Sequence, residues 1–115
     1  MTVRIAVAIL LALTGPASAH AFLLHASPAA GTMLDSPPKD VRLDFSETLE
    51  PTFSNVTVVD GTGHPVAAAA SVASGTKMSV ALQPLKPGAY SVTWHALSVD
   101  THRTQGSFRF TIKPR

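Results

Sequence analysis

Beyond residue 20 the chain consists of short segments in which apolar and polar residues alternate. Val41, Leu43 and Phe45, for example, alternate with Arg42 and Asp44. A period of two is typical of a strand that buries one face, and no helical period continues for three turns. The pattern predicts strands over residues 41–45, 55–58, 78–82, 90–96 and 107–112, with weaker strands over 22–26 and 66–72.

The breaks between these segments carry proline and glycine. Pairs such as Pro37-Pro38, Asp60-Gly61 and Pro87-Gly88 fall there, where a fixed or a positive φ favours turns. About seven strands, separated by turns roughly every 8–12 residues, are typical of an immunoglobulin-like sandwich. We therefore expect a single all-β domain of this kind.

Five aromatic residues on these strands share the apolar phase, so we expect them in the core between two sheets: Phe45, Tyr90, Trp94, Phe108 and Phe110. That placement leaves them unable to stack on a sugar or a base. Nine Lys and Arg against seven Asp and Glu give a net charge of only +2, without a basic cluster, which argues against nucleic-acid binding. The chain has no cysteine, so disulfides and thiolate metal sites are excluded.

The first 19 residues have the pattern of a secretory signal peptide. Arg4 precedes an apolar run from Ile5 to Leu13, and Ala17-Ser18-Ala19 is a small-residue cleavage pattern. The apolar run is about half of the roughly 20 residues that would span a bilayer. We therefore expect residues 1–19 to be removed, leaving residues 20–115 as an exported domain that is not inserted in the membrane.

Little in the sequence favours an enzyme. There is no Gly-x-Ser-x-Gly motif and no glycine-rich phosphate loop. Glu47 and Glu50 are two carboxylates close in sequence, as in glycoside hydrolases, but they are more simply solvated acids of a loop.

The predicted cleavage makes His20 the first residue, with a free amine beside its own imidazole. The amine and Nδ1 of the ring can chelate one metal ion, and the amine, with a pKa of about 7.7–8.0, loses its proton at modest cost. A second imidazole would complete three nitrogen donors in a plane, an arrangement that suits Cu(II).

Asp100 and His102 are the best candidates to complete such a site. They are two residues apart between two strong strands, so both side chains leave an extended segment on the same side. The carboxylate could occupy a coordination position or orient an imidazole. Of the other histidines, His95 is out of phase with the core, His64 lies in a glycine-rich turn, and the face of His25 is left unassigned.

Several motifs together give the chain a likeness to a known family. They are His20-Ala21 with Leu23, Ser27-Pro28-Ala29-Ala30-Gly31, Val41 to Glu47, Pro87 to Trp94, Ser98-Val99-Asp100-Thr101-His102 and Gly106 to Phe110. With these motifs in order across residues 20–115, the chain resembles the CopC-type periplasmic copper-binding proteins of bacterial copper resistance. The Ser98-Val99-Asp100-Thr101-His102 motif is the most specific of them.

The resemblance implies a seven-stranded Greek-key β-sandwich that holds Cu(II) through His20, Asp100 and His102, with Glu47 as a possible additional ligand. It implies a periplasmic protein that sequesters or carries copper without turnover, working with an inner-membrane permease of the CopD kind. Members with a second, Cu(I) site have a methionine-rich loop, whereas residues 61–74 contain no methionine and only His64. We therefore predict a Cu(II)-only protein.

Two alternatives belong to other classes. A copper monooxygenase would use the same N-terminal histidine brace, but the short chain, the absence of an exposed aromatic face and the anionic Asp100 argue against it. A metal-free immunoglobulin-like interaction module is the other, and it predicts that His20→Ala leaves function unchanged. Oxygen-dependent cleavage of chitin or cellulose would favour the enzyme.

Overall fold

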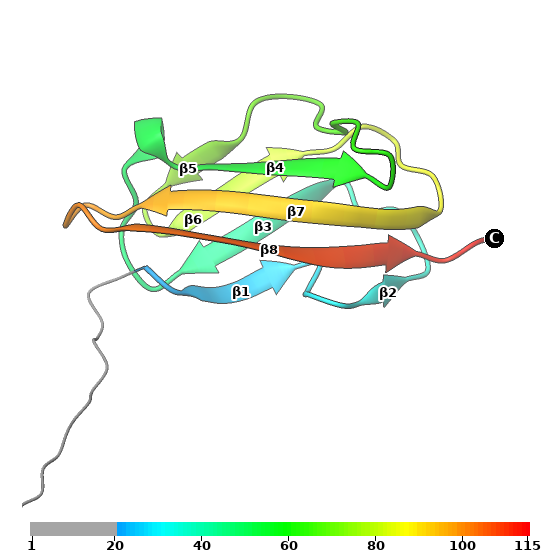
Figure 1. The fold of residues 1–115 in the computed structure, drawn as a ribbon, viewed down its shortest axis with the longest axis horizontal. Coiled ribbons are helices and arrows are strands. Elements are labelled where there is room, and N and C mark those ends of the chain that lie inside the picture. Colours follow the sequence, from blue (N-terminus) through cyan, green and yellow to red (C-terminus); the bar gives the residue numbers. More distant parts are fainter. Residues whose placement is uncertain (1–20) are drawn as a thin grey trace, which may run out of the picture.

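Two four-stranded sheets lie face to face in the computed structural model, which describes residues 21–115 (Figure 1). One sheet has the order β1-β3-β6-β5 and the other β2-β8-β7-β4. The elements are β1 (Leu23–Ser27), β2 (Met33–Leu34), β3 (Asp40–Phe45), the 3-10 turn η1 (Pro51–Phe53), β4 (Asn55–Asp60), β5 (Val72–Ser74), β6 (Lys77–Ala81), β7 (Gly88–Leu97) and β8 (Arg103–Ile112). The all-β, immunoglobulin-like sandwich predicted from the sequence is confirmed, although the described residues form eight strands. The predicted signal peptide, residues 1–19, and His20 lie outside the described residues.

Aromatic side chains join the two sheets through the core. The rings of Phe45 and Trp94, from opposite sheets, meet edge to face with centroids 5.0 Å apart. Tyr90 and Phe110 stack within one sheet at 5.4 Å, and the Tyr90 hydroxyl donates to the carbonyl of Lys86 at 2.6 Å. Phe108 packs against this core while remaining partly exposed. The predicted core position of the five aromatic residues is therefore confirmed.

The predicted strand over residues 66–72 is wrong in most of its length. Only its last residue, Val72, belongs to a strand, the short β5. The alanine-rich stretch has few large side chains to bury, and Ala68 donates its N–H to the carbonyl of Ala81 of β6 at 2.8 Å. The residues that flank the alanines lie along β4, where Val66 donates its N–H to the carbonyl of Val58 at 3.0 Å. The Ser71 hydroxyl accepts the N–H of Val56 at 3.2 Å. This segment therefore covers the outer edge of β4.

One end of the sandwich brings together three parts of the chain that are far apart in sequence. There β7 and β8 pair up to Leu97 and Arg103, so residues 98–102 form the connection at the tip. Leu49, after β3, forms an isolated bridge with Ser98. The start of β1 lies at the same end (Figure 1). Within residues 21–115 no helix has the length and apolar character needed to cross a membrane.

Candidate metal centre

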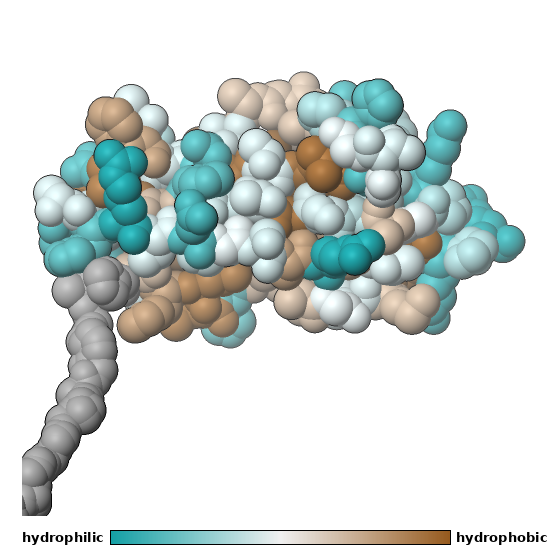
Figure 2. Space-filling model, in the orientation of Figure 1, coloured by the Kyte–Doolittle hydropathy of each residue, from teal (hydrophilic) through white to brown (hydrophobic). Residues whose placement is uncertain are grey.

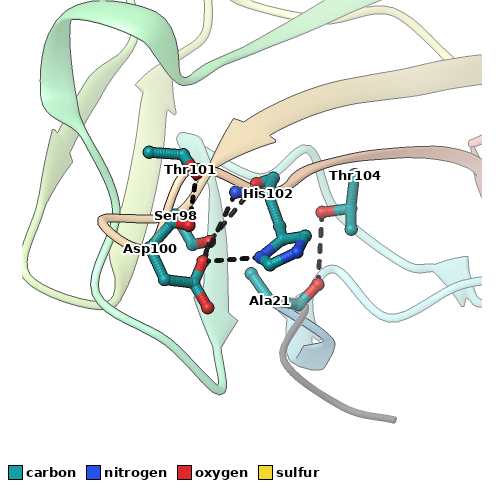
Figure 3. Close-up of polar contacts among 6 residues, drawn as sticks. All are labelled: Ala21, Ser98, Asp100, Thr101, His102 and Thr104. Carbon is teal, nitrogen blue, oxygen red and sulfur yellow. Dashed lines mark hydrogen bonds and ion pairs between the residues drawn. The ribbon is translucent and has the colours of Figure 1, made fainter. Parts of the chain in front are cut away.

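The connection between β7 and β8 is a tight turn closed by its own backbone. The N–H of Ser98 donates to the carbonyl of His102 at 3.0 Å, and the N–H of Thr101 donates to the carbonyl of Ser98 at 2.8 Å. Thr101 has a φ of 74°, in the left-handed region that β-branched residues rarely adopt. This turn places the side chains of Asp100 and His102 next to each other (Figure 3).

Asp100 is held through one of its two carboxylate oxygens. Oδ1 accepts a hydrogen bond from the hydroxyl of Ser98, a residue with no exposed surface. The same oxygen lies 3.2 Å from Nδ1 of His102 and accepts the backbone N–H of His102 at 3.4 Å. Ser98 and His102 therefore both contact the Asp100 carboxylate through Oδ1.

These hydrogen bonds also fix the charge of the site. The hydrogen bond from the Ser98 hydroxyl lowers the pKa of the Asp100 carboxyl below its ordinary value of 3.8, against an opposing effect of partial desolvation. The ring and backbone N–H of His102 lower this pKa further. Asp100 is therefore an anion at neutral pH, as a carboxylate that binds or orients a metal ligand must be.

The contact with Asp100 orients the His102 ring. With its proton on Nδ1, the neutral ring donates to Asp100 and has Nε2 as its metal-binding nitrogen. Metal-bound histidines commonly donate their second ring N–H to a carboxylate in this way. Asp100 can thus serve in both roles foreseen from the sequence, orienting His102 through Oδ1 and coordinating through Oδ2.

The first described residues approach the same turn and are held there. Ala21 is only 1% exposed, and its carbonyl accepts the hydroxyl of Thr104 at 3.2 Å (Figure 3). Phe22 donates its N–H to the hydroxyl of Ser46 at 2.8 Å, and its carbonyl accepts the N–H of Ser46 at 2.9 Å. His20, the predicted ligand that precedes Ala21, lies outside the described residues.

Glu47 follows β3 in the segment beside the turn. The next residue, Thr48, accepts the N–H of Val99 at 3.0 Å through its carbonyl. Within residues 21–115, however, no three His, Cys, Asp or Glu side chains gather into a group that could hold a metal ion. Asp100 and His102 are thus brought together as a pair, and the role of Glu47 stays a prediction.

The remaining histidines lie away from this pair. His95 is exposed on β7 and pairs with Gln105, as its phase predicted, and His25 pairs with Asp44 of β3. Nδ1 of His64 lies 2.8 Å from the Thr62 hydroxyl in the turn after β4.

Sequence reasoning missed the polar residues that hold the site, namely Ser98, Thr104 and Ser46. The hydroxyl of Ser98 lies inside the motif that was recognised, so its proximity to Asp100 could have been inferred from spacing. The contacts of Thr104 and Ser46 join residues more than 20 positions apart, and no local pattern indicates them.

The fold is that of a small β-sandwich with an Asp–His pair at one end, and comparison with known proteins gives the family. The CopC domain model matches residues 23–113. Copper resistance protein C of Pseudomonas syringae pv. tomato is 38% identical over 106 residues, covering 84% of this chain and 83% of the relative.

Solved structures agree with that match. The crystal structure of CopC from Methylosinus trichosporium OB3b aligns with a TM-score of 0.77 and 31% identity, over 84% of this chain and 96% of that one. PcoC, a methionine-rich copper resistance protein from Escherichia coli, aligns with a TM-score of 0.72 and 33% identity, over 83% and 100% of the two chains. The chain therefore belongs to the CopC family, whose members are copper-binding resistance proteins and not enzymes. The predicted family is confirmed.

Proposed function

We propose that this protein binds Cu(II) in the periplasm and sequesters or carries it for copper homeostasis and resistance. The observation that carries the proposal is the Asp100–His102 pair, with Nδ1 and Oδ1 3.2 Å apart, at the end of the sandwich where Ala21 is anchored. A carboxylate oxygen and an imidazole nitrogen are donors that Cu(II) accepts readily. Copper is the cargo in this proposal, not a catalytic cofactor.

The proposed ligand set combines this pair with His20. Removal of residues 1–19 would give His20 a free amine, which chelates together with its ring nitrogen. His102 then supplies the third nitrogen and Asp100 an oxygen, and Glu47 is a further oxygen donor within the same region of the chain. Three nitrogens and an oxygen in a tetragonal arrangement favour Cu(II) over the other common divalent ions.

The methionine positions support Cu(II) rather than Cu(I) as the cargo. Cu(I) prefers thioether and thiolate ligands, and the chain has no cysteine and three methionines. Met78 is 1% exposed in the core, and Met33 lies on β2. The methionine-rich PcoC differs in this respect, so we propose a Cu(II)-only protein.

A partner is proposed from the surface beside the pair. Phe22, Phe53 and Val99 are each more than half exposed, and large exposed apolar surface on a protein often marks a site of contact with a partner. Figure 2 shows apolar surface above and below a hydrophilic band at this end of the molecule. We propose that a CopD-like inner-membrane permease contacts this end and receives or supplies the copper.

The test is a Cu(II) titration of the protein that begins at His20, followed by electron paramagnetic resonance. We expect one tightly bound Cu(II) per chain with a signal from several nitrogen donors. His102→Ala should weaken binding by at least about 100-fold, since removal even of a residue that only orients a ligand costs roughly 10–100-fold. The matched control is His95→Ala, which removes an exposed histidine of β7 that pairs with Gln105 of β8.

Two results would overturn the proposal. One is a protein that binds no Cu(II) when it begins at His20. The other is equal affinity in the protein, its His102→Ala variant and a variant with one extra residue before His20. The extra residue converts the amine into an amide and removes the chelate, while residues 21–115 remain unchanged.

A further inference from the structure

We propose that Thr104 is a positioning residue for the copper site, because its hydroxyl anchors the backbone next to the predicted N-terminal ligand. The inference rests on the proposed function and deepens it. It concerns how a chain terminus, which is ordinarily the least ordered part of a domain, becomes a ligand with a defined place.

The anchor acts where the regular pairing of β1 has not yet begun. Ala21 and Phe22 precede the strand, which starts at Leu23. Besides the backbone hydrogen bond from the N–H of Ser46 to the carbonyl of Phe22 at 2.9 Å, two hydroxyl groups hold this stretch. Thr104 donates to the carbonyl of Ala21 at 3.2 Å, and the Ser46 hydroxyl accepts the N–H of Phe22 at 2.8 Å. The side chain of Ala21 is buried, so this stretch is fixed on both its polar and its apolar side.

The anchor connects the terminus to β8, the strand that begins directly after His102. Thr104 lies two residues after His102, so in extended backbone both side chains leave on the same side, about 6.6 Å apart along the strand. Figure 3 draws the Thr104–Ala21 hydrogen bond beside the His102 ring. Thr104 thus ties the main chain next to the predicted chelate to the start of β8, two residues after His102.

The expected benefit is a smaller loss of conformational freedom when copper binds. A terminus that is already held near its bound position loses less entropy on ligation than one that is free. Each hydrogen bond of this kind makes a modest contribution, so the loss of the Thr104 hydroxyl should weaken Cu(II) binding by about three- to tenfold without unfolding the sandwich.

The experiment compares Thr104→Val with Thr104→Ser and Thr111→Val. Valine keeps the shape of threonine and removes the hydroxyl, whereas serine retains the hydroxyl. Thr111 is the matched control because it lies near the other end of β8, paired with Ala89. We expect Thr104→Val to bind Cu(II) about three- to tenfold more weakly, and the other two variants to bind with the affinity of the wild type.

A second measurement separates positioning from a general loss of stability. Thr104→Val is combined with the extra residue before His20 that removes the amine chelate. If Thr104 acts through the terminus, the valine substitution has no further effect on Cu(II) affinity in this background, so the two changes are not additive. In the metal-free protein, the Phe22 amide should exchange its hydrogen faster in Thr104→Val than in Thr111→Val.

Each outcome decides the matter. Wild-type affinity in Thr104→Val, an equal loss in Thr111→Val, or full additivity with the blocked terminus overturns the positioning role and leaves the copper function intact. A wild-type protein that binds no Cu(II) overturns the proposed function, and the positioning role with it. The two failures are distinguishable because the second is visible without any variant.

Discussion

The hydroxyl of Ser98, which has no exposed surface, donates a hydrogen bond to the carboxylate of Asp100, whose side chain is partly open to solvent. A buried residue thereby sets the position and the charge of a side chain that reaches the surface. The same hydroxyl lies 3.2 Å from the carbonyl of His102, so one buried group contacts both ends of the candidate donor pair.

Ser98→Ala should therefore weaken Cu(II) binding although Ser98 is not a proposed ligand. Without the hydroxyl, Asp100 loses the hydrogen bond that contributes most to its lowered pKa, and only the contacts with His102 still hold the carboxylate. We expect a loss of about tenfold, the lower end of what removal of a supporting hydrogen bond usually costs a metal site. Competition with a chelator of known affinity measures it.

Ser107→Ala is the control for this substitution, since Ser107 is an exposed residue of β8 that pairs with Thr93. Unchanged affinity in Ser98→Ala would show that the Asp100 carboxylate is positioned by other groups. An equal loss in both variants would point to a general effect on the sandwich.

Copper affinity should fall steeply between pH 7 and pH 5. In the proposed site the amine and both imidazoles must lose their protons before they coordinate, so protons compete more strongly with Cu(II) for these nitrogens as the pH falls. We expect affinity to drop by at least about 1,000-fold over these two pH units. Titrations at fixed ionic strength measure it, and a flat profile contradicts the ligand set.

The Asp100 carboxyl contributes in a different pH range. Its pKa in the folded protein is lowered below 3.8, chiefly by the Ser98 hydroxyl. A lowered pKa means that the charged form stabilises the fold; this stabilisation is complete above pH 3.8 and is lost as the pH falls through the lower, folded value. Asp100 stays ionised between pH 7 and pH 5. We therefore expect the ratio of the Cu(II) affinity at pH 7 to that at pH 5 to be the same in Asp100→Asn as in the wild type.

Glu47 and Glu50 offer a direct test of the additional ligand. Both are half-buried residues of the segment after β3, and each becomes uncharged but equal in size when replaced by glutamine. If Glu47 coordinates copper, Glu47→Gln weakens binding and changes the electron paramagnetic resonance spectrum, while Glu50→Gln changes neither. Identical spectra for the two variants would remove Glu47 from the ligand set and leave His20, Asp100 and His102.

The fold could be predicted because its signal is local, whereas much of the site could not. Alternation in residues such as Val41, Leu43 and Phe45 determines which face of a strand is buried. The spacing of Asp100 and His102 predicted that both side chains would lie on the same side of an extended segment. The structure brings them into contact, but through a tight turn in which Thr101 has a φ of 74°.

Where large apolar side chains are missing, local signals fail. Thr104 and Gly106 occupy inward positions of β8, so the alternation is invisible there and the strand begins earlier than predicted, at Arg103. The hydrogen bond from Thr104 to Ala21 joins residues that are 83 positions apart in the sequence. It forms only when the whole sandwich has folded, so a pattern of neighbouring residues cannot predict it.

Gly106 gives a prediction about stability. It pairs with Trp94 across β7 and β8, and a Cβ at this position would lie 2.7 Å from Cζ2 of the indole ring. That ring is held by its edge-to-face contact with Phe45 at 5.0 Å, so it cannot move aside without disturbing the core. Gly106→Ala should therefore destabilise the domain by about 1–3 kcal/mol, the usual cost of overpacking.

Thermal unfolding measures this effect, with Gly61→Ala as the control. A Cβ at Gly61 would meet only the carbonyl of Ala89, at 3.8 Å, an ordinary contact. For a domain of this size each kcal/mol lowers the melting temperature by about 4–8 °C. Gly106→Ala should thus melt well below the wild type and Gly61→Ala close to it. Equal melting temperatures would mean that the indole has room to shift, and that Gly106 is not required by the packing of Trp94.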